Sequence, residues 1–248
     1  RDTHKSVRAS VGGGGIGPTA GEGAVVERGG REREGKTSAR SGPEPAVSPS
    51  FHAGVVTGYG DVNLEGKPIM GSADADLELY YWMDFQCPFC ERFERQTFPD
   101  LYRDHVETGD VRVVLTTVPF FGEDSMTAAV ASSCVWDSVR DDTSVYWDWH
   151  TAVMSQQGDR NSGWASAENL IAITEAVSGV DAGRVEDCIS SERGERAAVV
   201  RSEAETARSL GVRATPGFVV HNRDTGQSTS LSGAQPLELF ERTIDEVS

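Results

Sequence analysis

Lysine is almost missing from this sequence of 248 residues once its first fifty residues are set aside. The remainder holds 15 basic residues, of which only Lys67 is a lysine, against 33 acidic ones, a net charge of −18. Such dense carboxylates repel nucleic acid and anionic lipid, which argues against both as partners. They also suit concentrated salt, where the Debye length falls to about 3 Å. We therefore expect a halophilic source, such as a halophilic archaeon, with an ordinary acidic protein as the alternative.

Long apolar runs are missing as well. No stretch reaches the length of about 18 apolar residues that a membrane-spanning helix requires, and no basic segment followed by an apolar one marks a secretion signal. Residues 1–50 hold eleven glycines and no apolar run longer than "AVV", so burial there cannot offset the entropy of ordering. We predict a disordered tail or linker over 1–50, rich in glycine and charge, and one domain over 51–248.

Hydrophobic periodicity predicts the order of the remaining elements. The run "LELYYWM" is typical of a buried strand with alternate residues from Leu77 to Met83 on one face, and a helix over 88–109 separates it from a second strand in "DVRVVLTTVPF". Amphipathic helices fill about 123–210, and the strands "GFVVHN" and "QSTSLSG" and the helix "PLELFERTIDEV" follow. This order predicts an α/β domain, a small sheet layered with helices and interrupted by an all-helical insertion.

Cysteine is scarce, and only one pair is close in sequence. Cys87 and Cys90 lie in "DFQCPFCERF", whereas Cys134 and Cys188 stand alone, so the second C-x-x-C of a zinc ribbon is missing. Residues three apart on a helix have Cα atoms about 5–6 Å apart, within reach of a disulfide. A redox pair is therefore favoured over a metal half-site or two inert buried thiols.

The two sulfurs of this pair have different surroundings. Cys87 comes at or just before the first helical residue, Pro88, where unpaired N–H groups and the helix dipole favour a thiolate. Cys90 lies one turn further, on the face that we expect to pack against the sheet. We predict Cys87 as the nucleophile and Cys90 as the resolving thiol.

One further motif completes a pattern. In "GVRATPGFVV" the bond between Thr215 and Pro216 directly precedes a predicted strand and is a candidate for the cis form. Taken in order, "DFQCPFCERF", "TPGFVV" and the closing "SGAQPLELFERTI" resemble the DsbA-like branch of the thioredoxin superfamily, the thiol–disulfide oxidoreductases, over roughly residues 70–248. The resemblance implies a thioredoxin fold (β-α-β … β-β-α) with a helical insertion before the cis-proline loop.

The resemblance also implies a substrate site. Thr215 and Pro216 would flank Cys87 in space and pair with an extended substrate peptide as an added strand, with Pro88 and Phe89 beside them. Phe89 departs from the best-known oxidising relatives, which carry histidine at this position. Because Phe89 supplies no cation to the thiolate, the strength of oxidation stays open.

Two more roles follow from the resemblance. Asp84 matches the acid of the family that relays a proton from Cys90 during resolution, and a surface or capping carboxylate is the alternative. Cys134 and Cys188 match a second, structural disulfide of some relatives, and two separate buried thiols are the alternative.

The function implied is dithiol–disulfide exchange with substrate proteins that carry cysteines, most simply their oxidation outside the cytoplasm. It implies a re-oxidising or reducing partner, no metal, and no cofactor beyond the Cys87–Cys90 disulfide. The alternatives are a reductase or isomerase of the same fold and a non-catalytic peptide-binding or chaperone module.

Overall fold

The computed structural model describes residues 50–54 and 56–248. The tail predicted over 1–50 lies outside the described residues except for Ser50, which belongs to the first strand. Within the described part of the chain, no helix is long and apolar enough to cross a membrane.

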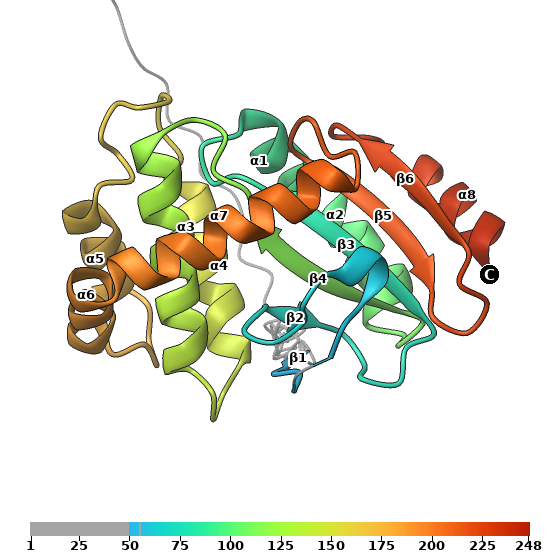
Figure 1. The fold of residues 1–248 in the computed structure, drawn as a ribbon, viewed down its shortest axis with the longest axis horizontal. Coiled ribbons are helices and arrows are strands. Elements are labelled where there is room, and N and C mark those ends of the chain that lie inside the picture. Colours follow the sequence, from blue (N-terminus) through green and yellow to red (C-terminus); the bar gives the residue numbers. More distant parts are fainter. Residues whose placement is uncertain (1–49, 55) are drawn as a thin grey trace, which may run out of the picture. The chain divides into compact units, whose positions relative to one another are not determined.

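Six strands form one mixed sheet in the order β1-β2-β4-β3-β5-β6 (Figure 1). Its strands are β1 (Ser50–Phe51), β2 (Ile69–Met70), β3 (Leu77–Met83), β4 (Val111–Thr117), β5 (Gly217–Asn222) and β6 (Ser228–Ser232). The central strand β3 pairs with β4 in parallel and with β5 in antiparallel orientation. The α/β class and the β-α-β … β-β-α order predicted from the sequence are thereby confirmed.

Strand β3 is buried along its whole length because both faces of the sheet are covered. Its predicted face is confirmed: Leu77, Leu79, Tyr81 and Met83 all join the larger apolar cluster. Tyr80 and Trp82 point the other way, into a smaller cluster that includes Ala204 and Ala207 of α7 (Arg193–Ser209).

The single helix predicted over 88–109 is divided in the structure. It consists of α1 (Pro88–Gln96), α2 (Phe98–Leu101) and a π-helical segment, η2 (Tyr102–Val106). The physical reason is Pro99, which has no backbone N–H to continue the ladder of α1 and clashes with the preceding turn. The single-helix prediction was therefore wrong at this point.

Helices cover the two faces differently. The remaining helices are a 3-10 turn, η1 (Tyr59–Asp61), and α3 (Glu123–Ser138), α4 (Ser144–Ser155), α5 (Ala167–Glu175), α6 (Ala182–Ser191) and α8 (Leu237–Val247). Figure 1 shows α3 to α6 as a block beside the sheet, with α7 in orange running from this block across one sheet face.

Three phenylalanines fix α1 and α8 on the other face of the sheet. The ring centroids of Phe93 on α1 and Phe218 on β5 are 4.6 Å apart, and Phe240 on α8 lies 5.3 Å from Phe93 and 4.9 Å from Phe218. Each such aromatic pair contributes about 0.5–1.5 kcal/mol beyond the burial of its area. This cluster holds the start of α1 in a fixed place relative to the start of β5.

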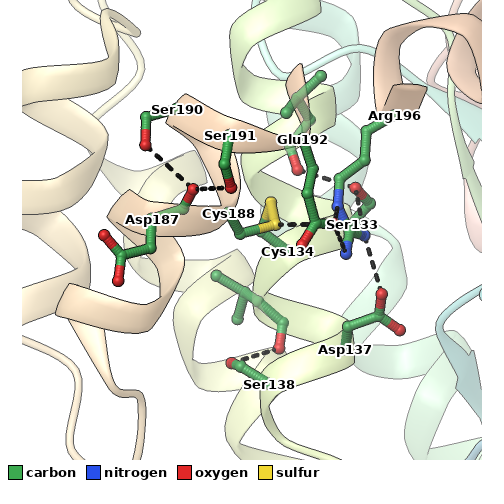
Figure 2. Close-up of a disulfide and its surroundings, with 12 residues drawn as sticks. Ser133, Cys134, Asp137, Ser138, Asp187, Cys188, Ser190, Ser191, Glu192 and Arg196 are labelled. Carbon is green, nitrogen blue, oxygen red and sulfur yellow. Dashed lines mark hydrogen bonds and ion pairs between the residues drawn. A yellow bond between two sulfur atoms is a disulfide. The ribbon is translucent and has the colours of Figure 1, made fainter. Parts of the chain in front are cut away.

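A disulfide joins two helices of the insertion. Cys134 on α3 and Cys188 on α6 are bonded with an S–S distance of 2.03 Å and a Cα separation of 6.0 Å (Figure 2). Next to it, Arg196 forms ion pairs of 2.8 Å with both Asp137 and Glu192, which ties α7 to the same place. The disulfide thus belongs to the insertion, separate from the Cys87–Cys90 pair.

Removing the disulfide with the double change Cys134→Ala and Cys188→Ala should lower the free energy of unfolding. The bond closes a loop of 54 residues, for which the loss of chain entropy in the unfolded state amounts to about 4 kcal/mol. Urea unfolding of both proteins without reductant measures the difference, with the Cys87–Cys90 pair oxidised in each. Four reactive thiols in the unfolded, unreduced wild-type protein would contradict the pairing.

Candidate active site

Cys87 stands at the point where the central strand turns into a helix. Strand β3 ends at Met83, and Cys87 is the N-cap of α1, with extended backbone angles (φ −85°, ψ 114°) and Pro88 at the first helical position. Its carbonyl accepts the N–H groups of Cys90 at 3.0 Å and Glu91 at 3.2 Å. Pro88 has no N–H, and the N–H groups of Phe89 and Cys90 are the ones that act on the Cys87 sulfur.

The Cys87 sulfur is buried and held by close partners. Cys87 is 1% exposed, and when protonated its thiol donates to the Thr215 carbonyl at 3.1 Å. The pKa of Cys87 is lowered to about 6, first by the hydrogen bond from the Cys90 thiol, then by the Thr215 side chain and the N–H groups of Cys90 and Phe89, against the effect of burial. The Thr215 hydroxyl is buried and has no hydrogen-bond partner among the described residues, so it is available to donate to the thiolate.

Cys90 is buried like Cys87, but its pKa is shifted in the opposite direction. It is fully buried on the sheet-facing side of α1. Burial raises the pKa of Cys90 well above its usual range, and the neighbouring Cys87 adds to this. The first sulfur is therefore a thiolate near neutral pH, while the second stays a thiol.

The loop before β5 lies across from Cys87. The Thr215–Pro216 bond is cis, and Gly217, which follows, begins a strand that pairs with β3. The pairing of β5 with β3 is what brings residues 87 and 215 together. Pro88 and Phe89 are both exposed. The Arg92 guanidinium lies over the Phe89 ring, 5.1 Å from its centroid.

Asp84 is bonded away from the two sulfurs. Its carboxylate accepts the N–H of Gln86 at 2.8 Å, the hydroxyl of Ser125 at 2.8 Å and the N–H of Phe120 at 2.7 Å. Burial raises the pKa of Asp84, against the lowering effect of these bonds. In the described residues no hydrogen bond joins this carboxylate to Cys90, which instead faces the backbone of Asp84.

Sequence reasoning missed two glutamine contacts to the active-site loop. Gln86 is fully buried, and its side-chain oxygen accepts the N–H of Asn161 at 2.6 Å. Gln157 donates its amide N–H groups to the carbonyls of Phe85 at 2.5 Å and Cys87 at 3.3 Å. No periodicity marks these residues, because both contacts cross from the insertion to the sheet domain.

A buried polar chain on the far side of Cys90 was also missed. The Tyr81 hydroxyl donates to Glu94 at 2.9 Å, and His150 lies 3.0 Å from both oxygens of that carboxylate. Burial, followed by the charges of Cys90 and Glu94, raises the pKa of Tyr81 well above its usual range. These three side chains line a cavity of about 460 Å³ between α1, α4 and the sheet.

We expect the reduced protein to hold Cys87 mainly as a thiolate at neutral pH. With a pKa of about 6, roughly ten thiolates exist for each thiol at pH 7. Thiolate absorbance at 240 nm, followed against pH, should show this midpoint and should lose it in Cys87→Ser. Cys90→Ala should raise the midpoint, because it removes the largest lowering cause. A wild-type midpoint near the ordinary value of about 8.5 would contradict this assignment.

Comparison with known proteins gives one family and one fold. The family model described as thioredoxin matches residues 63–246. Disulfide bond formation protein D of Bacillus subtilis is 26% identical over 164 residues, which cover 66% of this chain and 72% of that protein. Probable disulfide bond formation protein D of Bacillus anthracis is 25% identical over 154 residues, 61% of this chain and 68% of that protein.

Solved structures agree in fold. Oxidised BdbD from Bacillus subtilis has a TM-score of 0.63 at 21% identity, covering 80% of this chain and 97% of its own. DsbA from Chlamydia trachomatis has a TM-score of 0.61 at 22% identity, covering 80% and 96%. The family match spans most of the chain and the likeness in fold extends over the helical insertion. This chain therefore belongs to the thioredoxin family and has the fold of its DsbA-like members.

Proposed function

We propose that this protein is a thiol–disulfide oxidoreductase that passes a Cys87–Cys90 disulfide to substrate proteins with cysteines. The observation that carries the proposal is the contrast between the two sulfurs. Cys87 has a lowered pKa at a helix N-terminus, and Cys90, three residues on, is fully buried with a raised pKa. The names of the curated relatives, disulfide bond formation proteins, support the same chemistry.

The reaction proceeds in two exchanges. A substrate thiolate attacks the Cys87 sulfur of the disulfide, a mixed disulfide forms, and Cys90 leaves with the bonding electron pair and takes up a proton. A second substrate thiolate then attacks the substrate sulfur of the mixed disulfide, which yields the substrate disulfide and frees Cys87 as a thiolate. The substrate loses two electrons and the Cys87–Cys90 pair gains them, so a partner must re-oxidise the pair for turnover.

We infer the direction of exchange from the stabilisation of the Cys87 thiolate. Hydrogen bonds to this thiolate exist only in the reduced protein, so they stabilise the dithiol relative to the disulfide. A protein whose dithiol is stabilised gives its disulfide away readily. We propose that it oxidises substrates outside the cytoplasm, where the disulfides that it makes persist.

The substrate surface is proposed from what surrounds the sulfur. Thr215 and Pro216 lie across from Cys87 and would offer backbone groups to an extended peptide. Pro88 and Phe89 give an exposed apolar edge beside them. A peptide bound there would reach a sulfur that is otherwise almost covered.

The predicted role of Asp84 needs its own test. Asp84→Asn keeps an acceptor oxygen and removes the acid. If Asp84 relays the proton of Cys90, the variant should slow the attack of Cys90 on a preformed mixed disulfide at Cys87 several-fold. This attack is the reverse of the first exchange, and the pKa of Cys87 should stay near 6. Stopped-flow release of a fluorescent thiol measures the rate. An unchanged rate with a lower unfolding free energy would make Asp84 a structural carboxylate of the loop.

The redox equilibrium of the Cys87–Cys90 pair tests the proposal as a whole. In glutathione buffers read by thiol trapping, we expect a reversible couple with a potential of about −120 to −180 mV, as for oxidases and isomerases. A value near −270 mV would make the protein a reductase. With no reversible couple, and with a Cys87→Ser protein that still binds unfolded clients, a peptide-binding module would be the better account.

A further inference from the structure

The side chain of Gln157 reaches from the helical insertion to the backbone beneath the nucleophile. Gln157 follows the end of α4, and its amide donates to the carbonyl of Phe85 at 2.5 Å and that of Cys87 at 3.3 Å. One side chain therefore bridges the two carbonyls on either side of Gln86. It belongs to neither the C-x-x-C motif nor the cis-proline loop.

The two carbonyls depend on this contact to different degrees. The Cys87 carbonyl also accepts the N–H groups of Cys90 and Glu91, the first bonds of α1. For the Phe85 carbonyl, Gln157 is the hydrogen-bond partner found in the part of the chain that the structure describes. Phe85 is almost fully buried, so loss of this donor would leave a carbonyl unpaired where water has little access.

A second contact joins the same two segments. Gln86 is fully buried and accepts the N–H of Asn161 at 2.6 Å, while its own amide donates to Ser125 at 2.9 Å. Residues 85–87 are thus held by residues 157 and 161 through both their backbone and a side chain. The short segment after α4 forms one wall of the active-site loop.

We propose that Gln157 is a positioning residue for Cys87, by which the helical insertion holds the nucleophile at the N-terminus of α1. The proposal rests on the function proposed above and adds a residue outside its motifs. Without the amide, the Phe85 carbonyl loses its donor and the peptide group that it belongs to is less firmly held. The Cys87 sulfur then shifts relative to the N–H groups and the Thr215 side chain. The thiolate is then less stabilised, and so is the dithiol relative to the disulfide.

The experiment compares Gln157→Ala with Gln156→Ala. Gln156 is the adjacent residue of the same type, is exposed, and makes no hydrogen bond to the active-site loop within the described residues. For Gln157→Ala we expect the 240 nm midpoint of Cys87 to rise above about 6. The glutathione equilibrium should shift toward the disulfide by between about twofold and tenfold, the range for one lost hydrogen bond. Gln156→Ala should match the wild type in both.

A second variant guards against simple loss of folding. Gln157→Met keeps the length of the side chain and removes both N–H donors, so it should reproduce the shifts of Gln157→Ala. Both variants leave the Phe85 carbonyl unpaired and should be somewhat less stable than the wild type, so a single cooperative urea transition of the disulfide form is the control that each one folds. If both Gln157 variants titrate and equilibrate as Gln156→Ala does, the proposal is overturned.

Failure of the proposed function has a different signature. A wild-type protein without a reversible glutathione couple would end the oxidoreductase proposal, but the 240 nm titration needs no turnover. It would still show whether Gln157 governs the ionisation of Cys87.

Discussion

The contact between the Cys87 sulfur and the Thr215 carbonyl joins residues that are 128 positions apart, and most of the fold is needed to maintain it. Cys87 follows the end of strand β3, and Thr215 precedes strand β5, which pairs directly with β3. The phenylalanine cluster of α1, β5 and α8 fixes the position of α1, and so of Cys87, relative to β5 and Thr215. A shift of β5 by one residue would reverse its side-chain faces and remove Phe218 from this cluster. Catalytic geometry and core packing are therefore fixed by the same strand pairing.

Much of this arrangement could be predicted from the sequence, because the signals are local. The apolar alternation of β3 and the closing strands and helix each follow from patterns of a few residues. The N-terminal position of Cys87 on a helix also followed from Pro88 and the preceding strand. The break in the first helix was predictable in principle, because the ring of Pro99 leaves no backbone N–H for the helix. The apolar spacing on either side of Pro99, however, is that of one continuous helix.

The parts that escaped prediction are polar contacts between distant segments. Gln157 and Asn161 belong to no motif, and their importance comes from which buried groups they meet. The same holds for Asp84, whose carboxylate accepts three donors from its own loop, the segment after β4 and α3. Sequence spacing indicates that an acid stands three residues before Cys87, but only the fold decides which donors reach it. Each buried polar group requires a hydrogen-bond partner. Which partner is within reach depends on the tertiary structure.

The Cys87 thiolate is stabilised by short hydrogen bonds, which suits a chain with a large negative net charge. A net charge of −16 creates a field that opposes any new negative charge, and a thiolate stabilised by distant cations would be sensitive to that field and to salt. Here the stabilisation comes from hydrogen bonds of the Cys90 thiol, the Thr215 side chain and nearby N–H groups. Such contacts act over about 3 Å, well inside the Debye length of physiological salt, and they are buried. The apolar Phe89 beside the nucleophile is consistent with this design, because a thiolate held by fixed dipoles does not require a neighbouring cation.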